Sequence, residues 1–146
     1  MLDGLFVTPA VTAISEALGS ANAEGPIAVV GNAKLAVALA TKREVIAVGL
    51  SARAAKKLTN TRDDIATLDA ASLAAVIGVD VTDDEAWPAT LATWTRAVRD
   101  GGAIVFVDKG RAAEASRRAL CAGLSELEQR QSGRTVITSG LVTHLR

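Results

Sequence analysis

Apolar segments and amphipathic segments alternate along most of the chain. Continuous apolar runs are typical of strands that are buried on both faces, and they occupy residues 27–31, 44–49, 73–81 and 103–108. Segments with apolar residues at helical spacing follow these runs, at 34–41, 52–58, 83–100 and 110–123. A short additional strand is predicted at 64–69, and a helix from Pro9 or Ala10 to Leu18 is predicted before the first strand.

The pattern changes after residue 124. Residues 125–145 contain alternating polarity, the turn sequence QSGR and a β-rich run, which together predict an antiparallel hairpin at one edge of a sheet. Strands that alternate with helices predict a parallel sheet covered on both sides. We therefore expect an α/β three-layer sandwich with a Rossmann-like, mostly parallel, seven-stranded sheet and a C-terminal antiparallel hairpin. A single domain is expected, with a helix and loop at 1–24 and the sheet at 25–146.

Composition and charge exclude several classes of partner. The 146 residues are 49% hydrophobic but only 3% aromatic, so the core must consist mainly of Ala, Val, Leu and Ile. The 16 Lys and Arg residues balance the 16 Asp and Glu residues, which leaves no net positive charge to attract nucleic acid or anionic lipid. No signal peptide and no membrane-spanning apolar run is found, so we expect a cytoplasmic protein without nucleic-acid or membrane partners.

Residues that commonly carry nucleophilic or metal chemistry are scarce. Cys121 is the only cysteine and lies in an apolar helical pattern, which predicts a small buried core residue. His144 is the only histidine, so no two-histidine metal site is expected, and its side chain is predicted to be frayed. The sequence has no GK[ST] loop, GxGxxG, HExxH or paired-carboxylate motif. We therefore expect no catalytic constellation and no metal site.

Two segments resemble class I S-adenosylmethionine-dependent methyltransferases. WTRAVRDGGAIVFVDKG (94–110) is similar to that family's helix, glycine pair and fifth strand, and CAGLSELEQRQSGRTVITSG (121–140) is similar to its final helix, turn and hairpin. The resemblance covers roughly the whole chain after residue 24. It implies an antiparallel last strand that lies between its neighbours, and a cofactor site at the carboxyl ends of the first strands.

Departures from the family pattern are concentrated in the loops that would contact the cofactor. The family has an acid two places before a loop with three alternating glycines, whereas this chain has Val29 at the acidic position and retains only Gly31. A Cβ in place of a glycine hinders the approach of the backbone to a cofactor. Gly49 replaces the family's acid that accepts hydrogen bonds from the ribose hydroxyls, and losing such an acceptor typically costs ~1–3 kcal/mol.

The resemblance still implies candidate cofactor-binding positions. They are Gly31, Asn32, Lys34, Gly49, Asp69 and Asp80. Asn32 and Lys34 would contact the cofactor's carboxylate. Asp69 would be the acid after the third strand that holds the adenine amino group, and Asp80 would face the methyl-transfer site. Alternatively, both aspartates only cap turns.

Three hypotheses follow. The first is a compact, degenerate methyltransferase-like domain with weak or no catalysis, a pseudoenzyme that acts as a binding or assembly module, most simply as a homodimer. The second is an active S-adenosylmethionine-dependent methyltransferase with a divergent cofactor loop and a small-molecule substrate, because methyl transfer depends mainly on proximity and orientation. The third is that the Gly31 turn and the following helix bind another nucleotide or anion.

Overall fold

The computed structural model describes residues 2–20, 24–41, 43–49 and 60–144. The helices are α1 (Leu2–Ser20), α2 (Ala33–Ala40), α4 (Trp87–Ala97) and α5 (Ala112–Cys121), with 3₁₀ turns η1 (Ile65–Thr67) and η2 (Val81–Asp83). The strands are β1 (Ile27–Val30), β2 (Val45–Val48), β3 (Thr61–Arg62), β4 (Leu73–Val79), β5 (Val98–Lys109), β6 (Ser125–Ser132) and β7 (Thr135–Leu141). The helix predicted at 52–58 lies outside the described residues.

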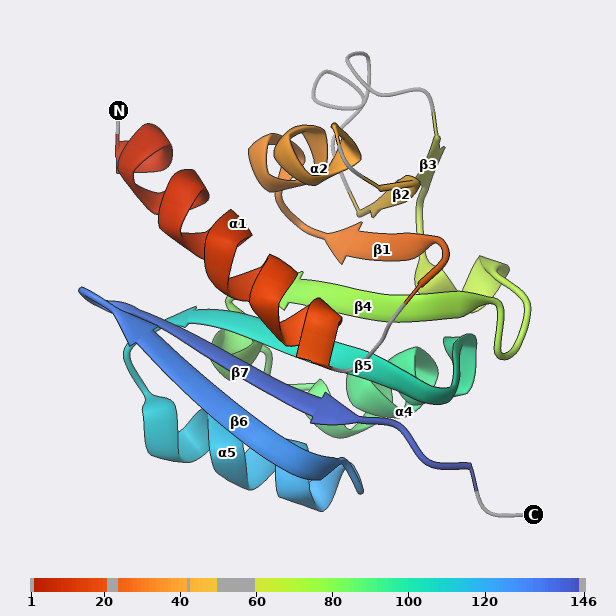
Figure 1. Cartoon of the computed structure of the whole chain (residues 1–146). Coiled ribbons are helices and arrows are strands. Elements are labelled where there is room, and N and C mark those ends of the chain that lie inside the picture. The colour runs from red at the N-terminus through yellow and green to blue at the C-terminus, as the bar shows by residue number, and fades with distance from the viewer. Residues whose placement is uncertain (1, 21–23, 42, 50–59, 145–146) are drawn as a thin grey trace.

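The described strands form one seven-stranded sheet in the order β3-β2-β1-β4-β5-β7-β6. β1 runs parallel to its neighbours β2 and β4, and Val29 of β1 lies opposite Ala47 and Ile77. β7 lies between β5 and β6 and runs antiparallel to both. The predicted Rossmann-like, mostly parallel sheet with a C-terminal antiparallel hairpin is therefore confirmed (Figure 1).

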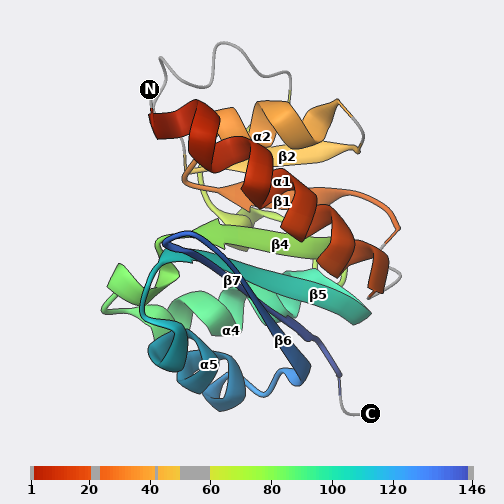
Figure 2. The same cartoon turned by 60° about the vertical axis from the view of Figure 1, so that its left-hand side comes forward.

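Helices cover both faces of this sheet. α1 and α2 lie on one face, and α4 and α5 lie on the other (Figures 1 and 2). On the first face, Ile14 and Leu18 of α1 are fully buried in a cluster that also contains Val29, Ile77 and Val105. Burying a large apolar side chain contributes ~1.5–3 kcal/mol, so α1 is an integral layer of the core. The three-layer arrangement agrees with the prediction.

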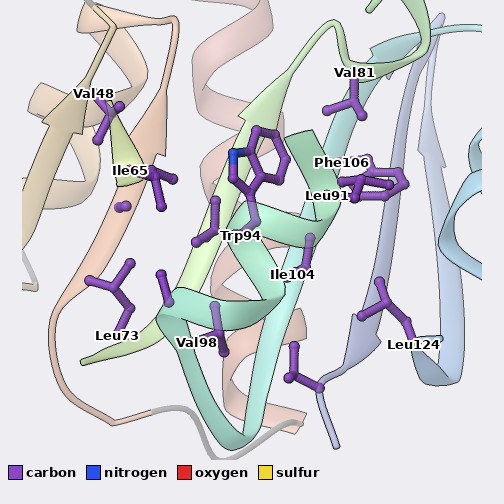
Figure 3. Close-up of a cluster of buried hydrophobic side chains, with 14 of the residues drawn as sticks. Val48, Ile65, Leu73, Val81, Leu91, Trp94, Val98, Ile104, Phe106 and Leu124 are labelled. Carbon is purple, nitrogen blue, oxygen red and sulfur yellow. The ribbon is translucent and has the colours of Figure 1, made fainter. Parts of the chain in front are cut away.

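Trp94 packs α4 onto the second face. Its side chain is 6% exposed and belongs to a cluster with Leu91, Val81 and Phe106 (Figure 3). Gly78 of β4 lies against the indole ring, and a Cβ at this position would overlap the ring. The glycine therefore allows α4 to lie close to β4, beside the carboxyl end of that strand.

Two helix boundaries differ from the prediction. The first helix begins at Leu2 and ends at Ser20, although Pro9 or Ala10 was expected to start it. Proline is most common in the first turn of a helix, but here the helix continues through it. α4 ends before the glycine pair at 101–102 that was expected to stop it, because β5 has already begun.

The strand predicted at 64–69 is wrong. η1 occupies most of this segment, and the third strand is the two-residue β3 before it. Asp64 stabilises η1, because its Oδ1 accepts a hydrogen bond from the Ala66 amide (3.0 Å) and its carbonyl accepts one from Thr67 Oγ1 (2.7 Å). Local hydrogen bonds of Asp and Thr thus compete successfully with strand formation.

The predicted environments of Cys121 and His144 are also wrong. Cys121 is exposed, because the buried positions of α5 are Ala115, Arg118 and Ala119 on another side of the helix. His144 is held in place: its Nε2 lies 2.6 Å from the carbonyl oxygen of Val98.

Candidate ligand pocket at the carboxyl ends of the parallel strands

A pocket of about 230 Å³ opens at the carboxyl ends of β1, β2 and β4. Ligands of open α/β sheets bind at this edge, beside the point where the strand order reverses, which here is between β1 and β4. Strand ends supply one part of the lining: Val30, Val48, Gly49 and Val79. Four carboxylates follow the strands: Asp63, Asp64, Asp80 and Asp84. Trp94 and Thr90 of α4 complete one side.

The turn between β1 and α2 lies beside this pocket. Gly31 has a φ of +82°, and its amide donates a hydrogen bond to the carbonyl of Val48 (3.0 Å). Asn32 caps α2, because its Oδ1 accepts a hydrogen bond from the Leu35 amide (2.9 Å). Lys34 is exposed in the first turn of α2. These three predicted residues follow the lining residue Val30 but do not line the pocket themselves.

Val29 is fully buried, so the position at which the family pattern has an acid belongs to the apolar core. Gly49, at the end of β2, does line the pocket. It has a φ of +72°, and its amide donates a hydrogen bond to the carbonyl of Arg62 (3.1 Å). Gly49 itself therefore contributes backbone and no side-chain acceptor to the described lining of the pocket.

Asp63 and Asp64 follow β3 directly, and sequence reasoning missed both. Both are exposed and line the pocket. The available signal is the acidic pair in TRDD, but β3 is short and polar, so the sequence pattern predicts the strand at 64–69 instead.

Asp69 lies at the other end of β4. It is exposed, and its carbonyl accepts a hydrogen bond from Ser72 Oγ (2.7 Å) in the turn that leads into the strand. The seven residues of β4 span ~23 Å at about 3.3 Å per residue, which separates Asp69 from Asp80. Asp80 lines the pocket, with a left-handed backbone (φ 58°) and an amide that donates to the carbonyl of Val107 (2.8 Å). Of the six predicted positions, the pocket thus brings together Gly49 and Asp80.

The described part of the pocket lining is acidic. Its described lining residues include four carboxylates and no basic side chain. The Asp84 carboxylate already makes two structural hydrogen bonds: its Oδ1 accepts one from the Ala86 amide (2.9 Å), and its Oδ2 accepts one from Thr90 Oγ1 (2.7 Å). Asp63 and Asp80 present exposed carboxylates. This arrangement suits a cationic or hydrogen-bond-donating ligand and disfavours a phosphate group.

Asp108, at the end of β5, is a buried acid behind the pocket wall. It is 1% exposed, and its Oδ1 accepts hydrogen bonds from the amide (2.9 Å) and the hydroxyl (3.0 Å) of Thr82. Its Oδ2 is buried and has no partner within the described part of the chain. Burial raises the pKa of Asp108 above its ordinary value of 3.8, against the lowering effect of the Thr82 hydrogen bonds, and the charges of Asp80 and Asp83 raise it further.

The described residues include no group of three or more His, Cys, Asp or Glu side chains that could hold a metal ion. No helix in the same residues has the length and apolarity needed to cross a membrane.

Comparison with solved structures identifies the fold as that of S-adenosylmethionine-dependent methyltransferases. A Methanococcus maripaludis protein assigned to these enzymes matches with a TM-score of 0.74 and 12% identity over 99% of this chain and 90% of its own. A chain in the complex of the Haloferax volcanii Trm112 methyltransferase activator with a methyltransferase matches with a TM-score of 0.73 and 15% identity, covering 91% of this chain and 89% of that one.

A third match is to a much longer protein, the Thermus thermophilus 16S rRNA N2 G1207 methyltransferase, solved with S-adenosylmethionine and guanosine. It matches with a TM-score of 0.65 and 18% identity over 82% of this chain, which spans only 36% of that protein. No protein-family model matches the sequence. No curated protein matches it either. At these identities the similarity defines a class I methyltransferase-like fold, and the fold alone does not define a substrate.

Proposed function

We propose that this chain is a degenerate methyltransferase-like domain, with weak cofactor binding and little or no catalysis, that serves as a binding or assembly module. The observation that carries the proposal is the turn between β1 and α2. Asn32 caps the helix there through the Leu35 amide, so its own side chain satisfies a donor that could otherwise bind a cofactor carboxylate.

Two further positions support weak binding. Val29 is fully buried and apolar, and Gly49 offers no side-chain acceptor to ribose hydroxyls. The acceptor missing at Gly49 costs ~1–3 kcal/mol, which weakens binding by ~5-fold to ~100-fold. We therefore expect a dissociation constant for S-adenosylmethionine of ~100 µM or above, in the upper part of the ~1 µM–1 mM range that is common for enzyme substrates.

The alternative is an active S-adenosylmethionine-dependent methyltransferase, and the acidic pocket is the observation that favours it. Asp63 stands after the third strand, where the family resemblance puts the acid that holds the adenine amino group, and Asp80 ends the fourth. We assign the adenine contact to Asp63 in place of Asp69, because Asp69 lies at the far end of β4. The acidic lining also argues against the third hypothesis, in which the site binds another nucleotide or an anion.

The test is an NMR titration of the labelled full chain with S-adenosylmethionine and with its demethylated product. Weak binding, with shifts confined to residues around the pocket, supports the proposal, whereas a micromolar dissociation constant for either compound overturns it in favour of the enzyme. Asp63→Asn should weaken binding at least threefold. Asp69→Asn, which makes the same change of charge, is the matched control and should leave the affinity unchanged.

The assembly part of the proposal concerns a homodimer or another protein partner. β6 forms an open edge of the sheet in the described residues, and such an edge is a template for pairing. We expect light scattering at high concentration to give about twice the 15.0 kDa of one chain. A monomer that also recovers no partner from an extract would remove this part of the proposal. We also propose that the protein is located in the cytoplasm, as the sequence leads us to expect.

A further inference from the structure

The segment 80–84 forms one wall of the pocket and carries Asp80, Val81 and Asp84 of its lining. The segment contains η2, whose backbone cannot satisfy all of its own hydrogen bonds. Residues of β5 and α5, on the far side of the wall, supply most of the missing partners. The position of the pocket wall therefore depends on side chains that do not line the pocket.

Asp108 holds the centre of the segment. Thr82 is only 4% exposed, and its amide and hydroxyl both donate to Asp108 Oδ1, at 2.9 and 3.0 Å. Without this oxygen, the buried amide of Thr82 would lose its acceptor. Asp108 is itself nearly inaccessible, and its second carboxylate oxygen has no partner in the described residues, so its side chain bonds only to Thr82 among them.

Arg118 of α5 holds both ends of the same turn. Its Nη1 donates to the carbonyls of Val81 (2.7 Å) and Asp84 (3.0 Å). Glu114 fixes the guanidinium group from one helical turn away, with Oε2 at 2.6 Å from Nε. Hydrogen bonds from Arg117 and from Arg118 lower the pKa of Glu114 to about 2, so Glu114 is ionised and the pair is formed at neutral pH.

We propose that Asp108 is a positioning residue for the ligand pocket, which fixes the segment 80–84 through Thr82 and so sets the places of Asp80 and Asp84. The expected effect of Asp108 on ligand binding rests on the proposed function of the pocket. The expected effect of Asp108 on the position of the segment 80–84 does not depend on any ligand. Asp108 acts together with Arg118, but it holds the backbone amide at the centre of η2, which no other described residue reaches.

The experiment compares three variants of the full chain by amide hydrogen exchange of residues 80–84. Asp108→Leu removes the acceptor while keeping the branching and the number of heavy atoms of the side chain, and exchange in this segment should accelerate more than tenfold beyond the change in global stability. Asp108→Asn retains an oxygen toward Thr82 and should bring exchange back to within threefold of the wild type. Val105→Ala makes a cavity on the opposite face of the sheet and should lower the melting temperature without selective exchange at 80–84.

A second readout is the NMR-measured affinity for S-adenosylmethionine, which should fall at least threefold in Asp108→Leu only. If Asp108→Asn exchanges as fast as Asp108→Leu, or if Val105→Ala accelerates the segment equally, the positioning role is overturned. If Asp108→Leu does not fold, Thr82→Val replaces it, with a smaller but still selective acceleration expected. If the wild type shows no cofactor binding, the proposed pocket function fails while the exchange result still decides the positioning role.

Discussion

Asp108 couples the stability of the protein to pH. In the unfolded chain its pKa is near the ordinary 3.8, and burial raises it in the folded protein. At pH values between 3.8 and the raised pKa of the folded state, the folded protein binds more protons than the unfolded chain. The contribution of Asp108 to the free energy of unfolding therefore falls as pH rises through this range. Asp108→Asn has no such titration. Urea denaturation at several pH values should show that wild type gains stability relative to Asp108→Asn as pH decreases from 8 toward 4.

Parallel stability profiles for wild type and Asp108→Asn would contradict this prediction. Asp69→Asn is a suitable control, because Asp69 is exposed and far from Asp108. Replacing it should leave the shape of the profile unchanged.

The sequence predicts a residue of the pocket correctly only where it also predicts the end of the preceding strand. Gly49 and Asp80 follow apolar strands that the sequence pattern identifies, and both line the pocket. Asp63 was missed because the two-residue β3 is polar and has no apolar run to mark it. Asp108 was missed for another reason: it continues a buried strand, and only the fold brings Thr82 to it.

At the scale of elements, long apolar runs determined the central strands. β4 and β5 are buried along most of their length, so the continuous runs at 73–81 and 103–108 were sufficient. The hairpin followed from its turn sequence. η1 could not be read in the same way, because the capping bonds of Asp64 and Thr67 are local and leave no periodic pattern.

The contact between α4 and β4 gives a prediction at this scale. Gly78→Ala would place a Cβ within the indole ring of Trp94, and overpacking of this kind costs ~1–3 kcal/mol. We expect that loss in chemical denaturation, with a lower melting temperature. Gly19→Ala in α1 is the matched control: an added Cβ there meets no atom within 4 Å, and Ala is the better helix former. Equal effects of the two substitutions would show that the contact with Trp94 is unimportant.

For the whole molecule, the distribution of charge matters more than its sum. The formal net charge is zero, yet four carboxylates gather at the pocket and none of its described lining residues is basic. A concave site with one sign of charge concentrates ligands of the opposite sign. S-adenosylmethionine carries a positive sulfonium, whereas its demethylated product has a neutral sulfur. The pocket should therefore prefer the methylated form.

This preference is the prediction that tests the molecule as a whole. In low salt we expect S-adenosylmethionine to bind at least threefold more tightly than its demethylated product, and ATP not to compete at equal concentration. Raising the ionic strength to ~0.3 M should reduce the difference, because exposed charges such as Asp63 and Asp80 are screened. Asp80→Asn should reduce it as well, and Asp69→Asn should not. Equal affinity for both compounds, or tighter binding of ATP, would mean that these carboxylates do not face the ligand.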